Sequence, residues 1–217
     1  MRKTISILLV LATLLCMASC DFIDDAKTLE NVSELRNYYY VGNSDSYFVE
    51  MYGGKRESPL VIDGVAGKLD DYIKIKVLVK NGEAESISYH IGINEGEYEG
   101  DLSKEVVGGH FVVTINVAEL EDEYVLKLTS NGKTEEVKLR SVAGSDFIDY
   151  KKAREIAENE LKDCIASFPD KYEIHIKLIE GEKGTFRYYW YVAFMDGNKL
   201  CACLIDPTTS KVIAKRV

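Results

Sequence analysis

Histidines and cysteines are the residues of this 217-residue chain best suited to metal or nucleophilic chemistry. The three histidines, His90, His110 and His175, are too scattered for a metal-binding spacing, and only they titrate near neutrality when unperturbed. His90 and His175 fall on the polar sides of expected strands, so we expect solvated side chains there. No catalytic motif occurs. The sequence therefore predicts no catalytic residue, no metal site and no cofactor.

The first nineteen residues have the features of a bacterial export signal. Arg2 and Lys3 precede an apolar run without charge, and small residues follow it. A cationic start, an apolar centre and small residues at the end are typical of a signal peptide. We therefore expect residues 1–19 to be removed.

A cysteine follows these small residues directly. The sequence Met17-Ala-Ser-Cys20 resembles the bacterial lipobox, in which a signal peptidase cuts before the cysteine and the thiol carries diacylglycerol. The resemblance implies an extracytoplasmic protein anchored to the bacterial cell membrane through lipid on Cys20. Residues 20–37 are the expected lipidated N-terminus and spacer, with a short helix over the polar residues 21–37 as the alternative. An ordinary cleaved signal with an incidental cysteine and an uncleaved anchor are the alternatives.

Acidic residues exceed basic ones and are unevenly distributed. The chain has 36 Asp and Glu against 27 Lys and Arg, and the net charge of -9 disfavours nucleic acid as a partner. Residues 21–142 hold 24 acidic and 13 basic residues, whereas residues 143–217 hold 12 of each. Because such asymmetry is a cue for a boundary, and residues 143–145 are small, we expect a domain junction there.

The first half alternates apolar and polar residues with the period of two that strands show. Ile73, Ile75 and Val77 are one such series, and Asn81-Gly82 and Asn131-Gly132 are typical hairpin turns. About seven short strands in about 100 residues predict an all-β immunoglobulin-like sandwich over residues 38–142. The tyrosines at 38–40 are either a contact surface or part of an edge strand.

Residues 146–217 predict a separate, small α+β domain. Apolar residues at three- and four-residue spacing predict an amphipathic helix over residues 149–167. Three or four strands follow it, so we expect one helix to cover one face of an antiparallel sheet.

Three pieces of this half resemble the PepSY family, which comprises extracytoplasmic modules of bacterial metallopeptidase propeptides and cell-envelope proteins. The pieces are Ala153-Arg-Glu-Ile-Ala157, Tyr191-Val-Ala-Phe and residues 204–213, although the family usually has glycine where Ser210 stands. The resemblance spans residues 149–215. It implies binding to a peptidase or another envelope protein, without catalytic residues.

The central strand of this half is apolar on both faces. Trp190 and Phe194 share one face, and Tyr189, Tyr191 and Met195 share the other, which a single helix cannot cover. Either the first domain docks on the second face, or Tyr189, Tyr191 and Met195 are a binding site for a partner.

Three cysteines remain after lipidation and removal of the leader. Cys201 and Cys203 share a strand face, and Cys164 lies on the inward stripe of the helix, so one helix-to-sheet disulfide is conceivable. Buried free thiols are the alternative, and in both cases Cys164 is expected in the core.

These features predict a lipid-anchored envelope protein without enzyme activity, which binds or regulates a protein partner through its PepSY-like domain. The alternative is a structural spacer whose two domains pack on each other. An uncharacterised enzyme is a third hypothesis, which the absence of any catalytic motif disfavours.

Overall fold

The computed structural model describes residues 28–118, 120–168, 171–182 and 184–217. The chain divides into two compact units, Met1–Asn31 and Val32–Val217, and the strands belong to the second. The structure is mostly β, with 52% strand and 9% helix. Cys20 and the expected signal peptide lie outside the described residues. In the described part of the chain, no helix has the length and apolar character needed to cross a membrane.

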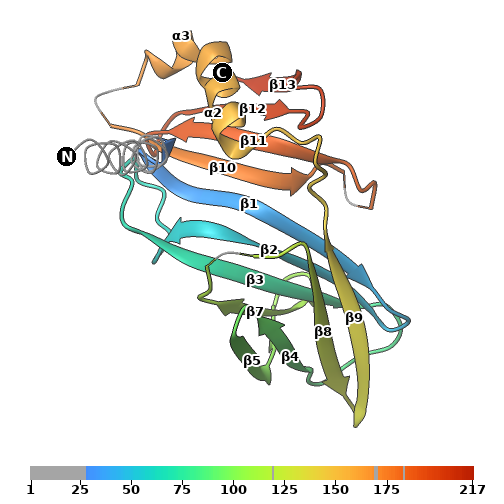
Figure 1. The fold of residues 1–217 in the computed structure, drawn as a ribbon. Coiled ribbons are helices and arrows are strands. Elements are labelled where there is room, and N and C mark those ends of the chain that lie inside the picture. The colour runs from blue at the N-terminus through green and yellow to red at the C-terminus, as the bar shows by residue number, and fades with distance from the viewer. Residues whose placement is uncertain (1–27, 119, 169–170, 183) are drawn as a thin grey trace, which may run out of the picture. The chain divides into compact units, whose positions relative to one another are not determined.

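The described strands form one 13-stranded sheet. They are β1 (Val32–Asn43), β2 (Tyr47–Glu57), β3 (Leu69–Val79), β4 (Ser88–Ile93), β5 (Gly96–Asp101), β6 (Ser103–Lys104), β7 (Phe111–Ile115), β8 (Glu123–Ser130), β9 (Lys133–Ser141), β10 (Glu173–Glu180), β11 (Tyr188–Met195), β12 (Leu200–Ile205) and β13 (Val212–Arg216). The main path runs β13-β12-β11-β10-β1-β2-β3-β7-β6, and β9, β8, β4 and β5 continue from β1 on a second path (Figure 1).

Strand β1 is the place where the sheet branches. One of its edges pairs antiparallel with β2. The other edge of β1 pairs with two strands. The first half of β1 pairs in parallel with β10, as far as Arg36 opposite Lys177. The last residues of β1 pair antiparallel with β9, beginning with Tyr40 opposite Ser141. Strands β9 and β10 therefore leave β1 on the same side and separate from each other.

The largest core lies between β1, β2, β3 and β7 on one side and β4, β8 and β9 on the other. Alternate residues of these strands point into it, as their period of two requires. Tyr40, for example, is 2% exposed, and its hydroxyl donates to the backbone carbonyl of Glu121. The fully buried apolar residues of this core include Val49, Met51, Ile75, Ile91, Leu126 and Leu139.

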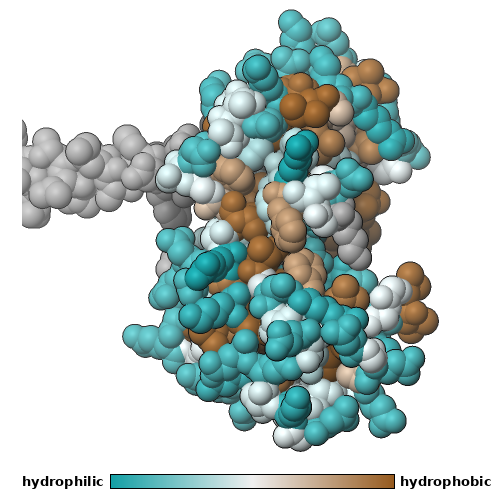
Figure 2. Space-filling model, turned by 90° about the vertical axis from the view of Figure 1, so that its right-hand side faces the viewer, coloured by the Kyte–Doolittle hydropathy of each residue, from teal (hydrophilic) through white to brown (hydrophobic). Residues whose placement is uncertain are grey.

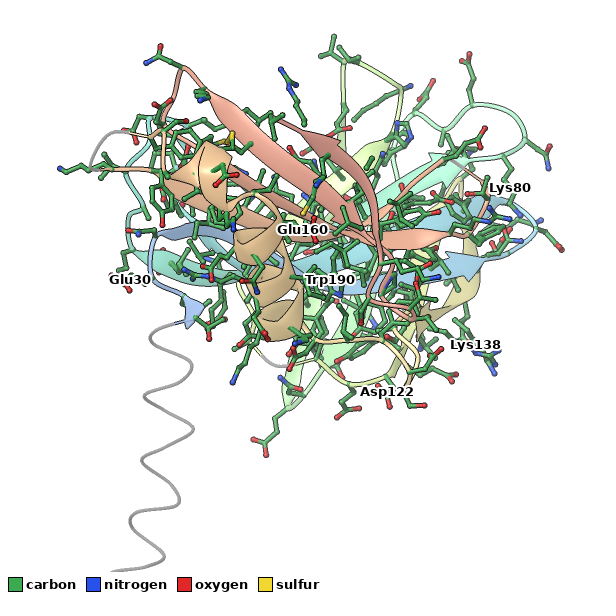
Figure 3. The ribbon with its side chains drawn as sticks, turned by 90° about the horizontal axis from the view of Figure 1, so that it is seen from above. Glu30, Lys80, Asp122, Lys138, Glu160 and Trp190 are labelled. Carbon is green, nitrogen blue, oxygen red and sulfur yellow. A yellow bond between two sulfur atoms is a disulfide. The ribbon has the colours of Figure 1, made fainter. Side chains whose placement is uncertain are left out.

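Helix α2 (Tyr150–Glu160) covers one face of β10, β11 and β12 through Ala153 and Ala157, both fully buried. The carboxylate of Asp149 caps its first turn by accepting the backbone N–H of Lys152. Trp190 of β11 lies beside α2 (Figure 3), and its indole N–H donates to the carbonyl of Ile148. This bond fixes the point at which the chain enters the helix.

A second, four-residue helix, α3 (Lys162–Ile165), follows α2 after Leu161. The helix predicted over residues 149–167 is thus divided into two. Cys164 of α3 forms a disulfide with Cys201 of β12, with their Cα atoms 6.3 Å apart, and Cys203 is a buried free thiol. Cys164 itself is half-buried rather than fully enclosed.

The predicted fold class, an immunoglobulin-like sandwich followed by a separate α+β domain, is wrong. Residues 38–142 and 146–217 share one nearly closed, barrel-like sheet, because β1 pairs with β10 as well as with β2 and β9. Strand β1 also begins at Val32, inside the range 20–37 expected to be a spacer. The alternation of residues located strands but carried no information on which strand each edge would join.

Candidate functional site

The branch point at β1 leaves a solvent-open hollow of about 520 Å³ between the end of β9 and the start of β11. The segment after β9, the β10–β11 loop and the β12–β13 turn complete its wall. The side of the molecule that these loops face is shown in Figure 2, where hydrophobic side chains gather between its upper and lower parts. The wall is formed by Val41, Arg140, Ser141, Val142, Phe147, Phe186, Arg187, Tyr188, Tyr189, Asp206, Pro207 and Thr208.

The β10–β11 loop holds an aromatic side chain at the rim of this hollow. The carboxylate of Glu180 accepts the backbone N–H groups of Gly184 and Phe186, at 2.9 and 3.1 Å. Phe186 has a φ of +52° and is 60% exposed. A left-handed backbone is uncommon for an aromatic residue, and such strain concentrates at functional sites. The loop therefore keeps Phe186 in an unfavourable backbone conformation and leaves its large apolar ring exposed to solvent.

Two consecutive tyrosines of β11 line the wall. The ring of Tyr189 packs on the backbone of the loop at Gly181. A Cβ placed on Gly181 would lie only 2.5 Å from this ring. Tyr188 contacts Tyr39 of β1, with ring centroids 5.2 Å apart. Burial, together with the negative charges of Glu180 and Glu50, raises the pKa of Tyr188 to about 12. Its hydroxyl is therefore neutral at physiological pH and suited to hydrogen bonding.

The charged groups of the wall differ in how they are engaged. Asp206 is committed to the β12–β13 turn, where its carboxylate accepts the backbone N–H groups of Thr208 and Thr209, and these bonds lower its pKa. Arg140 lies 3.7 Å from Glu123 in an exposed ion pair. Arg187 has no ion-pair partner among the described residues. The wall of the hollow thus holds aromatic residues together with an arginine that makes no ion pair within the described residues.

The structure separates the three residues predicted as a binding site. Tyr189 lines the hollow, whereas Tyr191 is half-buried and packs with Ala193 and Ala202. Met195 belongs to the same small apolar cluster and is 9% exposed. Only Tyr189 is therefore placed to meet a partner in the hollow. Phe186 and Arg187 were missed, because nothing in the local sequence indicates a rim residue.

The first half of the chain meets the second half along the edge of a strand. Strand β1 joins β10 edge to edge through backbone hydrogen bonds. The strands of residues 32–141 therefore continue the same sheet beyond β10.

A second group of functional side chains lies across the junction of β1 and β10. The carboxylate of Glu34 is 2.5 Å from the ammonium of Lys177 and 3.0 Å from the guanidinium of Arg36, and it accepts the hydroxyl of Tyr72 at 2.9 Å. Burial alone would raise the pKa of Glu34, but the two cations and these hydrogen bonds outweigh it and lower the pKa to about 2. Glu34 is therefore ionised and fully engaged.

His175 is part of the same group and is 2% exposed, so the prediction of a solvated side chain is wrong for it. Burial and the charge of Lys177 lower its pKa to about 4, against the opposing effect of Glu34. Its Nε2 lies 3.9 Å from a carboxylate oxygen of Glu173, and burial raises the pKa of Glu173. His90, by contrast, is 3.1 Å from Glu97 with 41% of its side chain exposed.

This junction group is enclosed rather than open to a substrate. Glu173 is completely buried, and Ser33 donates a hydrogen bond to it at 2.7 Å. Within the described residues, no cluster of three or more His, Cys, Asp or Glu side chains is arranged to hold a metal ion. The group is therefore suited to joining the two strands, and the hollow is the better candidate for recognition of another molecule.

Comparisons with known proteins do not assign the chain to a family. No family model matches it, and no curated protein or solved structure matches it either.

Proposed function

We propose that this chain is a bacterial lipoprotein, anchored outside the cytoplasm through Cys20, that acts by binding a protein partner rather than by catalysis. The cationic start, apolar run and lipobox-like end of residues 1–20 support the anchor. The Cys164–Cys201 disulfide supports an extracytoplasmic location, because disulfides persist in oxidising compartments.

The observation that carries the binding proposal is the hollow beside β11. Its wall includes exposed Phe186, Arg187 and Tyr189, which come from one short stretch of chain. Aromatic residues and arginine are the residue types that dominate protein-binding energy. A partner that fits this wall presents an apolar or aromatic side chain next to a carboxylate.

The class of partner follows from the PepSY resemblance. Residues 149–215, which carry that resemblance, supply most of the wall, including the β10–β11 loop and the β12–β13 turn. We infer that the partner is a peptidase or another cell-envelope protein, which the hollow holds or restrains.

Anchoring and binding need separate tests. Cells producing the wild-type chain should incorporate labelled palmitate into it, and Cys20→Ala should abolish the label and release the protein from the membrane fraction. Continued labelling or unchanged membrane retention of Cys20→Ala would contradict the anchor.

Binding is tested by crosslinking in intact cells followed by purification. Arg187→Glu and Tyr189→Ala should each reduce a crosslinked partner at least tenfold. Arg216→Glu makes the same charge change on exposed β13, outside the wall of the hollow, and should leave capture unchanged. Equal capture by all variants, or no partner at all, would count against the hollow.

A rigid envelope spacer is the second candidate. The single sheet that runs through the unit Val32–Val217 favours it, because one continuous sheet resists bending more than two linked domains do. A chain that crosslinks to nothing, yet whose deletion alters envelope spacing, would support this role.

A further inference from the structure

The loop between β2 and β3, residues 58–68, exposes a run of large apolar side chains. Leu60, Val61, Ile62 and Val65 are 38%, 47%, 58% and 48% exposed. Single exposed apolar residues are ordinary in soluble proteins, but a contiguous group marks a contact surface. We call residues 60–65 the apolar tip.

The apolar tip lies at the end of the sheet where β1 begins. Strand β2 runs antiparallel to β1 (Figure 1). Its penultimate residue, Arg56, pairs with Glu34 near the start of β1. Strand β10 is parallel to β1 and starts at the same end. The loop lies against the β11–β12 turn, where the backbone of Gly64 closely approaches that of Asp196. A Cβ placed on Gly64 would lie only 2.9 Å from the backbone of Asp196. The tip is therefore fixed beside the point where the chain enters the sheet.

A second run of adjacent exposed apolar residues lies toward the opposite end. Val106 and Val107 are 102% and 86% exposed in the loop between β6 and β7. That loop leads into Phe111, which pairs with Val77 near the end of β3. This end of β3 pairs with the start of β2, and the start of β2 pairs with the last residues of β1. The two apolar runs therefore lie toward opposite ends of β3.

Chain length relates the tip to the proposed anchor. Twelve residues lead from Cys20 to Val32, the first residue of β1. A chain of that length reaches at most about 40 Å. The start of β1, and the apolar tip beside it, therefore lies within about 40 Å of the proposed lipid anchor, whereas Val106 lies toward the other end of the strands.

We propose that the apolar tip rests in the interfacial region of the membrane that holds the Cys20 lipid, so that the protein has two points of contact with the bilayer. This rests on the proposed lipid anchor. Asp63 and Lys68 give the loop one charge of each sign, so apolar contact rather than attraction to anionic lipid holds it there. Half-buried Phe168 and Tyr172, whose rings stack 5.8 Å apart just before β10, add aromatic groups at this end.

The test places a tryptophan on each apolar run of the full-length, lipidated protein in vesicles containing brominated lipid, which quenches tryptophan within the bilayer. Ile62→Trp reports on the tip, and Val106→Trp is the matched control at the far end. The wild-type protein supplies the baseline, because its Trp190 is 3% exposed. Flotation of the vesicles measures anchoring independently.

We expect the Ile62→Trp signal to be quenched at least twofold more than the Val106→Trp signal, equally in zwitterionic and anionic vesicles. Protein that floats while both tryptophans are quenched equally, or not at all, would overturn the tip contact and leave the anchor standing. Quenching that requires anionic lipid would overturn the apolar mode of contact. Protein that does not float overturns the anchor and the tip contact together.

Discussion

The carboxylate of Glu34 and the ammonium of Lys177 lie 2.5 Å apart, and they join β1 to β10 across the seam between the two halves of the chain. Their side chains are 4% and 19% exposed. A charge left alone in such a place is costly, since burial removes the water that would otherwise solvate it. The seam is therefore held by an ion pair as well as by backbone hydrogen bonds.

Removing the carboxylate should destabilise the protein strongly. Glu34→Gln leaves Lys177 and Arg36 without their shared counter-charge, and we expect the free energy of unfolding in urea to fall by about 3 kcal/mol. Lys68→Gln breaks the exposed pair with Asp70, 3.2 Å apart, and should change it by less than about 0.5 kcal/mol. Similar losses for the two variants would contradict the role of the seam.

Acid should weaken the fold in two stages. The pKa of His175 is about 4 in the folded chain, below its unfolded value of 6.5, so only the unfolded state takes up the proton between these values. Stability should fall by about 3 kcal/mol as the pH drops from 6.5 to 4. Glu34, with a folded pKa of about 2 against 4.5, should remove a similar amount between pH 4.5 and 2.

His175→Gln separates the two stages. The variant should show a flatter dependence of unfolding free energy on pH between 6.5 and 4.5, while the loss below pH 4.5 remains. Urea titrations at pH 7, 5.5, 4.5 and 3 measure this. Parallel curves for the wild-type and His175→Gln proteins would rule out His175 as the group responsible.

The disulfide between α3 and β12 should contribute substantially to stability. Cys164 and Cys201 are 37 residues apart. Closing a loop of that length lowers the conformational entropy of the unfolded chain and so raises its free energy by about 4 kcal/mol. Cys164→Ser should therefore lower the free energy of unfolding by about 3 kcal/mol and abolish its response to reductant. Cys203→Ala, at the free thiol, should leave that response intact.

The turn before β13 should be improved by glycine. Ser210 has a φ of +60°, which costs a residue with a Cβ about 1 kcal/mol. Ser210→Gly should raise the thermal midpoint by a few degrees. The reverse change, Gly197→Ala at a φ of +90°, should lower it, and calorimetry distinguishes the two directions.

Much of the local structure could be predicted from the sequence. The alternation of Ile73, Ile75 and Val77 located β3, and Asn131-Gly132 makes the β8–β9 turn with positive φ at both residues. These features depend on neighbours in the chain. The lipid anchor on Cys20 also rests on sequence alone, and it stays a prediction because residues 1–27 lie outside the described part.

Only the tertiary structure decided how the strands pair. The apolar period of β1 and β10 reveals the faces of each strand but not its edges, and the backbone groups at an edge are the same in every sequence. The parallel pairing of β1 with β10 therefore could not be predicted, and neither could its consequences. That pairing merges the two expected domains, buries His175 beside Glu34, and opens the hollow where β9 turns away.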